Sequence, residues 1–231
     1  MPALVKQSAP LVAVVNMGLG NLFSIGQACR YVGLRSLVTA DKDRILEAEA
    51  VILPGVGAFG TAMQRLRALD LVSPLRDKAL SGAPFLGICL GFQLMMEQSL
   101  EFGRHQGLGL WPGRVLPLPR RSTGGERLKV PRVGWSPIHP PPGGKGPAWT
   151  EGLLAGVPPG EYMYFVHSYY VEPAGGLRAQ ALTEYGGHRY CAFLAQDRLM
   201  GCQFHPERSG PAGLRLYHNL ARLLAGAGEG A

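Results

Sequence analysis

The first half of the chain alternates short, continuous apolar runs with longer segments whose apolar residues recur at helical spacing. Runs such as AVIL and FLGI are typical of parallel strands that are buried on both faces of a sheet. They predict strands at Val12 to Val15, Leu34 to Thr39, Ala50 to Leu53 and Phe85 to Ile88. The helical spacing predicts helices at Leu22 to Val32, Phe59 to Leu69, Leu71 to Leu80 and Phe92 to Ser99. This alternation indicates parallel βαβ crossovers.

From Arg114 onward the pattern changes to closely spaced strand candidates. They lie at Arg114 to Leu118, Tyr162 to Val166, Tyr169 to Glu172, Ala179 to Tyr185, Cys191 to Gln196 and Leu199 to Gln203. Such a series predicts an antiparallel extension that covers one side of the parallel sheet. The stretch SPIHPPPGGKGPAW, residues 136–149, is rich in Pro and Gly, and we expect it to be an exposed loop.

The chain closes with a predicted helix. Ser209 is its expected N-cap, Pro211 lies in its first turn, and one face carries Leu214, Tyr217, Leu220, Ala221 and Leu224. The fold class is therefore α/β, with a mostly parallel central sheet flanked by helices and an antiparallel extension. We expect a single domain over residues 1–231, with residues 1–10 flexible.

Composition agrees with a folded protein, because 46% of the residues are hydrophobic and 17% are charged. The apolar run near the start is too short for a signal peptide, and no stretch reaches the roughly 18 apolar residues of a membrane span. We therefore expect no membrane partner and a cytoplasmic location. The 4 cysteines are sparse for this length, which predicts free thiols.

The formal net charge is +7, which raises the question of an anionic partner. The basic residues between Pro112 and Pro137 are not interleaved with aromatic residues; they are Arg114, Arg120, Arg121, Arg127, Lys129 and Arg132. A solvated loop or hairpin face explains this cluster better than nucleic-acid binding, and docking on an acidic protein surface remains an alternative. We expect no nucleic-acid partner.

Cys89 is the leading candidate for chemistry. It ends an apolar strand and has Gly87 and Gly91 two residues away on each side, the sequence form of a nucleophile elbow between a strand and a helix. The start of that helix would favour the thiolate. The alternative is a small buried residue packed near a turn.

A distant QFHPE motif supplies a candidate base, His205, and a carboxylate, Glu207. In an extended segment, residues i and i+2 point to the same side, so one strand end would present both groups to Cys89. The three residues form a Cys-His-Glu triad for nucleophilic attack on a carbonyl. The alternative of a metal site at Cys202 and His205 lacks a second pair of ligands, and we expect no metal.

Attack on a carbonyl also requires donors for the developing oxyanion. The backbone N–H of Leu90, the residue after the nucleophile, is the first candidate. Gly55 and Val56, in the PGVG turn that ends another predicted strand, are the second source, because open α/β sheets bind ligands at the carboxyl ends of their strands.

With PGVG, GICLGFQ and FHPE in this order, the chain resembles the class I glutamine amidotransferases. Within that family, MGLGN near Asn16, PRVGW ending at Trp135 and YFVHSYY at Tyr164 to Tyr170 resemble the glutaminase subunits of imidazole glycerol phosphate synthases. The resemblance covers about Val12 to Leu224. It departs from the commonest pattern at Phe92, often Met, and at Arg208, often Lys.

The resemblance implies that Cys89 attacks the side-chain amide of glutamine and that water hydrolyses the resulting thioester. It also implies a set of glutamine-holding positions: Gly57, Gln93, Glu101, Ser168 and Tyr169. The implied partner is a (βα)8-barrel cyclase subunit in a heterodimer, with Arg208, Asn16 and Trp135 at the interface. No cofactor is expected, and no phosphate-cradling motif is present.

Three alternatives share parts of this pattern. The chain could be the glutaminase of a chorismate-using amidotransferase, a stand-alone cysteine hydrolase, or a binding module without catalysis. A pull-down that compares a barrel cyclase with a chorismate enzyme distinguishes the first alternative from the implied function. Activity without a partner separates the second, and an intact function in Cys89→Ala separates the third.

Overall fold

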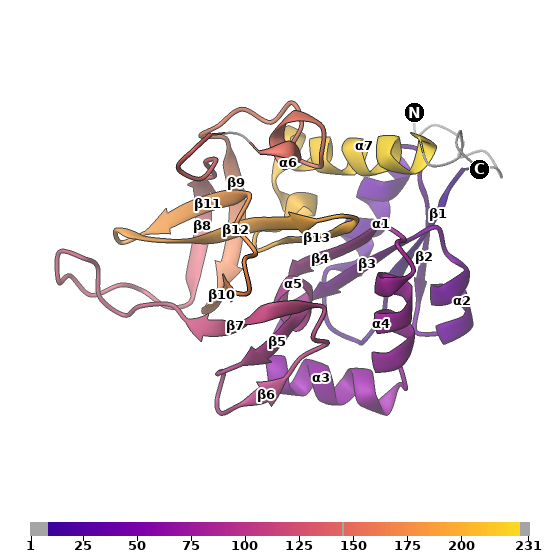
Figure 1. Ribbon diagram of the computed structural model, residues 1–231, viewed down its shortest axis with the longest axis horizontal. Helices are drawn as coiled ribbons and strands as arrows, with labels where there is room; N and C mark the ends of the chain where they lie inside the picture. Colours follow the sequence, from indigo (N-terminus) through magenta and orange to yellow (C-terminus); the bar gives the residue numbers. More distant parts are fainter. Residues whose placement is uncertain (1–8, 145, 227–231) are drawn as a thin grey trace.

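The computed structural model describes residues 9–144 and 146–226, and a seven-stranded sheet forms its centre (Figure 1). Its strands are β1 (Leu11–Val15), β2 (Arg35–Thr39), β3 (Ala50–Gly55), β4 (Phe85–Cys89), β11 (Ala181–Tyr185), β12 (His188–Gln196) and β13 (Leu199–Cys202). They are arranged in the order β11-β12-β13-β4-β3-β1-β2. The five strands from β13 to β2 are parallel, and β11 and β12 continue the sheet antiparallel at one edge. The expected mostly parallel α/β sheet is confirmed.

The register of the central strands brings distant residues to one edge of the sheet. Gly55 at the end of β3 pairs with Cys89 at the end of β4, and Cys202 at the end of β13 pairs with Ile88. Because these strands are parallel, their carboxyl ends meet at this edge. The segments that follow β3, β4 and β13 therefore start close together.

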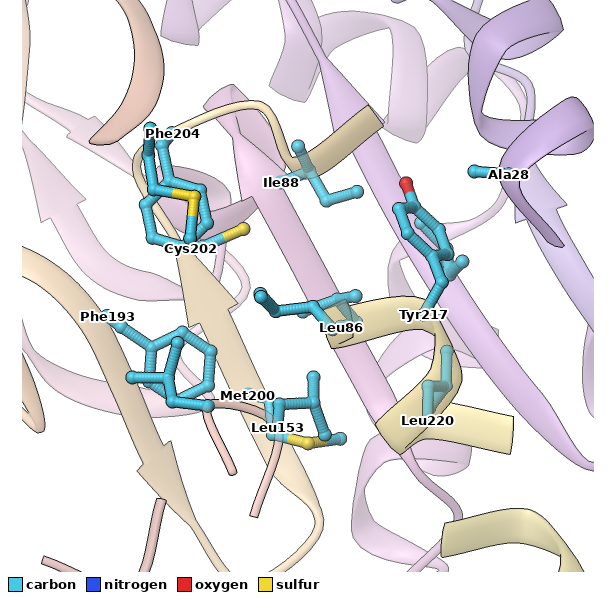
Figure 2. Packing of buried hydrophobic residues seen from close by; sticks show 14 of the residues in the cluster. Ala28, Leu86, Ile88, Leu153, Phe193, Met200, Cys202, Phe204, Tyr217 and Leu220 are labelled. Carbon is cyan, nitrogen blue, oxygen red and sulfur yellow. The ribbon is translucent and has the colours of Figure 1, made fainter. Parts of the chain in front are cut away.

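Helices cover both faces of the sheet. One face carries α1 (Leu22–Tyr31), α6 (Pro147–Thr150) and α7 (Gly210–Gly226), and the other carries α2 (Lys42–Glu47), α3 (Phe59–Ala68), α4 (Val72–Leu80) and α5 (Leu90–Leu94). On the first face, Tyr217 and Leu220 of α7 pack toward Leu86 and Ile88 of β4 (Figure 2). The helical spacing predicted this apolar face of α7.

Two smaller sheets complete the molecule. The first has the order β10 (Tyr169–Pro173), β7 (Trp111–Pro117), β5 (Met96–Ser99) and β6 (His105–Gln106), and it packs on the second face through Trp111, Val115 and Val171. The other pairs β8 (Arg132–Pro137) with β9 (Tyr162–His167). A 3-10 turn, η1 (Pro206–Arg208), links β13 to α7. The extension is thus divided between the central sheet and separate sheets, where we predicted one layer.

The predicted helix from Phe92 to Ser99 is wrong in its second half. Helix α5 ends at Leu94, and Gln98 and Ser99 pair with Arg114 and Val115 of β7. Tertiary pairing thus overrides a local pattern that fits a helix equally well. Short elements were also missed, namely α2, α6, β6 and β8.

The loop at 136–149 is not exposed throughout. Ile138 is fully buried, and the buried ring of Trp149 in α6 donates its N–H to the carbonyl of Gln180 at 2.6 Å. The expectation of flexibility for residues 1–10 falls mostly on residues 1–8, which lie outside the described residues. Among residues 9–144 and 146–226, the structure contains no helix that is long and apolar enough to cross a membrane.

The basic cluster is divided between two environments. Arg120, Arg121, Arg127 and Lys129 are exposed on the segment that extends between β7 and β8 at the left of Figure 1, as a hairpin face would be. Arg132 is only 3% exposed, so its assignment to that solvated face is wrong. Its guanidinium stacks on the ring of Phe165 at 4.4 Å, which explains why a cation is stable there.

Candidate active site

Cys89 lies in a sharp turn between β4 and α5. Its φ is +53°, a left-handed conformation that is rare for a residue with a side chain. The flanking glycines leave room for this turn. A Cβ at Gly91 would lie 1.7 Å from the carbonyl oxygen of Leu53, and one at Gly87 would lie 2.7 Å from Cα of Phe92. The predicted strand-to-helix elbow is confirmed.

The sulfur of Cys89 is close to two other segments. The residue is 4% exposed, and its Sγ lies 3.7 Å from the carbonyl oxygen of Val166 in β9. Nε2 of Gln203, the residue after β13, also lies 3.7 Å from Sγ. The nucleophile candidate is therefore contacted from β9 and from the end of β13, and the other three cysteines are buried free thiols.

His205 and Glu207 form the predicted pair, but on a different backbone. Nδ1 of His205 lies 2.8 Å from Oε1 of Glu207, and both side chains are buried. Only His205 is extended, because Pro206 begins η1 and the N–H of Arg208 donates to the carbonyl of His205 at 3.0 Å. The predicted extended segment is wrong beyond His205. The turn itself brings the carboxylate to the imidazole.

Ser209 fixes this turn. Its hydroxyl donates to the carbonyl of His205 at 2.7 Å and accepts the N–H of Tyr164 at 3.0 Å. The expected N-cap role is therefore only partly right, since the Ser209 carbonyl accepts the N–H of Gly213 but the hydroxyl bonds to β9 and η1. The hydroxyl of Ser209 thus joins the backbone of His205 to that of Tyr164.

The electrostatics of His205 favour its charged form. Burial lowers the pKa of His205, but the neighbouring Cys89 and Glu207 outweigh burial and raise that pKa to about 10. Nδ1 is engaged by Glu207, whereas Nε2 is buried without a hydrogen-bond partner among the described residues. Nε2 is consequently the ring nitrogen available to exchange a proton with the thiol.

The proposed oxyanion donors lie beside the sulfur in the fold. Gly55 pairs with Cys89 in the sheet register, and a Cβ at Gly55 would be 3.1 Å from Cβ of Leu90. Leu90 is the first residue of α5, so its N–H has no acceptor within that helix. Val56 is 40% exposed and directly follows β3, and Gly57 has a φ of +101°. This turn lies at the edge of the sheet where β4 ends at Cys89.

The positions expected to hold glutamine are brought together in part. Nε2 of Gln93 donates to the carbonyl of Tyr169 at 2.8 Å, and Ser168 lies between β9 and β10. Glu101 is buried, and its Oε2 accepts the N–H of Phe59 at 2.5 Å. Burial raises the pKa of the Glu101 carboxyl. Glu101 therefore also caps α3, two residues beyond Gly57.

The expected interface residues lie on the surface near the base. Trp135 is 53% exposed and its ring lies 5.9 Å from that of Tyr164, while the guanidinium of Arg208 lies 5.1 Å from the same ring. The ring of Tyr164 lies 6.4 Å from that of His205. Asn16 follows β1, at the same edge of the sheet, where its Oδ1 accepts the N–H of Gly18 at 3.0 Å.

Sequence reasoning missed Gln203 and Tyr164, which both contact the site. Gln203 precedes His205 by two residues, so the alternation of the strand was the signal that could have identified it. Tyr164 became relevant only through the pairing of β8 with β9. No group of three or more potential metal ligands occurs among the residues that the structure describes.

Comparisons with known proteins place these residues in a family context. The family model for class-I glutamine amidotransferases matches residues 13–222. The imidazole glycerol phosphate synthase subunit HisH of Synechococcus elongatus is 42% identical, covering 95% of this chain and 96% of that protein. The corresponding subunit of Syntrophotalea carbinolica is 41% identical, covering 92% and 100%. Subunit HisH 1 of Legionella pneumophila (strain Lens) is 36% identical, covering 92% and 99%.

Solved structures share the fold at lower sequence identity. A putative GMP synthase protein from Thermoplasma acidophilum has a TM-score of 0.69 at 15% identity, covering 97% of this chain and 98% of that one. The PurLQS structure from Thermotoga maritima has a TM-score of 0.67 at 18% identity, covering 94% and 99%. At such identities the likeness concerns the fold alone.

Proposed function

The chain belongs to the class I glutamine amidotransferase family, and on that premise we propose that it is the glutaminase subunit of an imidazole glycerol phosphate synthase. It hydrolyses glutamine to glutamate and ammonia and passes the ammonia to a cyclase subunit. The relatives at 36% to 42% identity, which match over nearly their whole length, support this choice of subunit. We place the activity in the cytoplasm, in agreement with four free cysteines.

Cys89 and His205 carry the first half of the reaction. The sulfur of Cys89, as thiolate, attacks the amide carbon of the glutamine side chain and forms a tetrahedral intermediate. Its oxyanion accepts hydrogen bonds from the N–H of Leu90 and from Gly55 or Val56. His205 then donates its Nε2 proton to the leaving nitrogen, so that ammonia departs and a thioester remains.

The second half releases glutamate. His205, now neutral, takes a proton from a water molecule, which attacks the thioester carbon and displaces the Cys89 thiolate. Glu207 holds Nδ1 throughout and keeps Nε2 directed at the reacting atoms. The observation that carries this proposal is the buried His205–Glu207 pair behind the elbow cysteine, with Nε2 left free.

The remaining residues hold the substrate. Glu101 has one oxygen on the N–H of Phe59, and its second oxygen pairs with the α-ammonium group of glutamine. Gln93 uses its amide nitrogen inside the protein, so its amide oxygen is the group that faces the ligand. Gly57, Ser168 and Tyr169 supply main-chain groups and shape around the same site.

The partner is a (βα)8-barrel cyclase in a heterodimer, and it seats on the exposed residues Trp135 and Arg208 and on the half-buried Asn16. Trp135 and Arg208 both contact the ring of Tyr164, so a partner at this place lies next to the base. Enclosure by the partner protects ammonia from protonation and loss during its transfer.

The test measures glutamate and ammonia release from glutamine by the wild-type chain and by Cys89→Ala, with and without a barrel cyclase carrying its substrate. We expect hydrolysis that rises in the loaded complex and disappears in Cys89→Ala. The control is Cys202→Ala, because Cys202 is buried and its thiol faces the carbonyl of Gly87. Equal rates of glutamate release for wild type and Cys89→Ala would exclude the mechanism. Rates that are the same with and without the cyclase would exclude this partner.

A further inference from the structure

A buried series of hydrogen bonds leads to the sulfur of Cys89 through Gln203. Gln203 is fully buried, and its Nε2 lies 3.7 Å from Sγ of Cys89. Its Oε1 accepts a hydrogen bond from Nε2 of Gln93 at 3.1 Å. The same Gln93 nitrogen donates to the carbonyl of Tyr169 at 2.8 Å. Gln203 therefore connects the nucleophile to α5 and β10.

The donor and acceptor roles in this series of hydrogen bonds are fixed by the chemistry of the groups. The carbonyl oxygen of Tyr169 can only accept, so Gln93 must present its NH2 group there. That NH2 group can only donate, so Gln203 must present its oxygen to Gln93. The NH2 group of Gln203 must then face Sγ, and a flipped amide would set two donors against each other. The sulfur consequently receives an N–H donor.

A second series of hydrogen bonds reaches the same carbonyl of Tyr169 from His167, and its donor and acceptor roles are also fixed. Nδ1 of His167 lies 3.0 Å from the carbonyl of Tyr169 and must donate, so its Nε2 accepts from the hydroxyl of Tyr190 at 3.2 Å. This hydroxyl in turn accepts from Nη1 of the buried Arg132. Burial lowers the pKa of His167 to about 3, with the charge of Arg132 acting in the same direction, so His167 stays neutral.

We propose that Gln203 is a positioning residue that holds the sulfur of Cys89 and stabilises its thiolate through an N–H donor whose orientation Gln93 fixes. The proposal deepens the glutaminase function and rests on it. An N–H donor binds the anion more strongly than the thiol, since hydrogen bonds to charged groups are the stronger ones. The proton that leaves the sulfur moves to Nε2 of His205.

The charged groups around Cys89 are few, which makes the contribution of Gln203 measurable. His205, just after β13, interacts with the sulfur, and Glu207 is bonded to the other ring nitrogen of His205. The thiol of Cys202 in β13 is close enough to Cys89 to interact with it electrostatically. From β9, the group at the sulfur is the uncharged carbonyl of Val166. Changes at Gln203 leave all of these groups in place.

The test follows alkylation of Cys89 by iodoacetamide against pH, with the modified residue identified by mass spectrometry. Gln203→Met keeps the size of the side chain but removes the donor, and Gln203→Glu places a carboxylate oxygen at the sulfur. Relative to wild type, we expect the pH–rate profile to move up by about one pH unit in Gln203→Met, so that the rate at any pH below the wild-type midpoint falls about tenfold. Gln203→Glu moves it at least as far.

The control is Asn219→Asp, which also replaces a buried amide donor, here bonded to the carbonyls of Leu153 and Ala155 away from Cys89. Its alkylation profile stays that of wild type even though its stability falls. In the Gln203 variants kcat for glutamine falls more than KM rises, because the substrate contacts remain. Folded Gln203 variants with the wild-type profile overturn the proposal.

Alkylation requires no glutamine and no partner, so its outcome is independent of whether the chain is a glutaminase. If neither Gln203 variant folds, an NMR titration of the wild-type protein tests the proposal. The Gln203 side-chain amide signals in a proton–nitrogen NMR spectrum then move with the same midpoint as alkylation, and signals that stay still refute the contact.

Discussion

His205 shows how one residue acquires chemistry from its surroundings. Burial alone would keep its imidazole neutral, but Cys89 and Glu207 raise its pKa to about 10. The ring is 5% exposed, so solvent screens these interactions only weakly. These surroundings therefore favour the imidazolium form of His205.

This shift makes stability depend on pH in a defined direction. The pKa in the folded chain is above the ordinary value of 6.5, so the folded state binds the proton more tightly than the unfolded state. The stabilisation from His205 is therefore complete below about pH 6.5 and is lost as the pH rises toward about 10. We expect the free energy of unfolding of wild type to fall over this window relative to His205→Asn.

Urea unfolding of both proteins at several pH values measures this difference. The control is His218→Asn, because His218 is exposed and its loss leaves the pH dependence of wild type unchanged. A difference between wild type and His205→Asn that stays constant from pH 6 to pH 10 would contradict the raised pKa.

At the residue scale, the sequence predicted the triad members because each carries a local signal. Glycines on both sides marked Cys89, and the short spacing of His205 and Glu207 marked a pair. Gln203 has no such signal, since its role depends on Gln93 and Tyr169, which are distant in the sequence. Arg132 was misjudged because only tertiary packing shows the aromatic rings that bury it.

At the scale of elements, Ser209 directly follows η1, and its hydroxyl bonds to Tyr164 in β9 and to His205 just before η1. Ser209→Ala leaves the N–H of Tyr164 and the carbonyl of His205 without this partner. We expect a loss of about 2 kcal/mol in the free energy of unfolding, because buried polar groups then stay unsatisfied. Glutaminase activity falls as well, because the turn no longer fixes His205.

Urea unfolding and glutamate release measure the two effects of Ser209→Ala. The control is Ser81→Ala, which removes an exposed hydroxyl that donates to the carbonyl of Lys78 and should change stability by less than ~0.5 kcal/mol. Full activity in Ser209→Ala would show that η1 is fixed by other contacts.

Elements of the parallel core were predictable because their runs are continuous and apolar. The failures concern elements whose state depends on a partner strand, such as β5, where a helical pattern pairs with β7 instead. Strand β8 was missed because its residues alternate only weakly in burial, and its pairing with β9 defines it. The local propensity of a segment does not show which strand it will pair with.

At the scale of the whole molecule, the proposed docking face predicts a separation between stability and assembly. Trp135→Ala removes an exposed aromatic anchor, so we expect the Kd for the cyclase to rise at least tenfold, as for an interface hot spot. The stability of the isolated chain changes little. Titration calorimetry with the barrel cyclase measures the affinity.

Leu80→Ala is the matched control, since Leu80 is 73% exposed at the end of α4, a helix with no proposed partner contact. It should leave the affinity unchanged. An unchanged Kd in Trp135→Ala would move the interface away from β8.

The route from Trp135 to the imidazole runs through main-chain bonds. Trp135 pairs with Tyr164 across the β8–β9 ribbon, and the carbonyl of Tyr164 accepts the N–H of His205 at 2.9 Å. A partner that displaces β8 would therefore shift the backbone that carries the imidazole of His205. Alanine substitutions at Trp135 and Tyr164 leave these two main-chain contacts in place, so proline or amide-to-ester replacement would be needed to interrupt them.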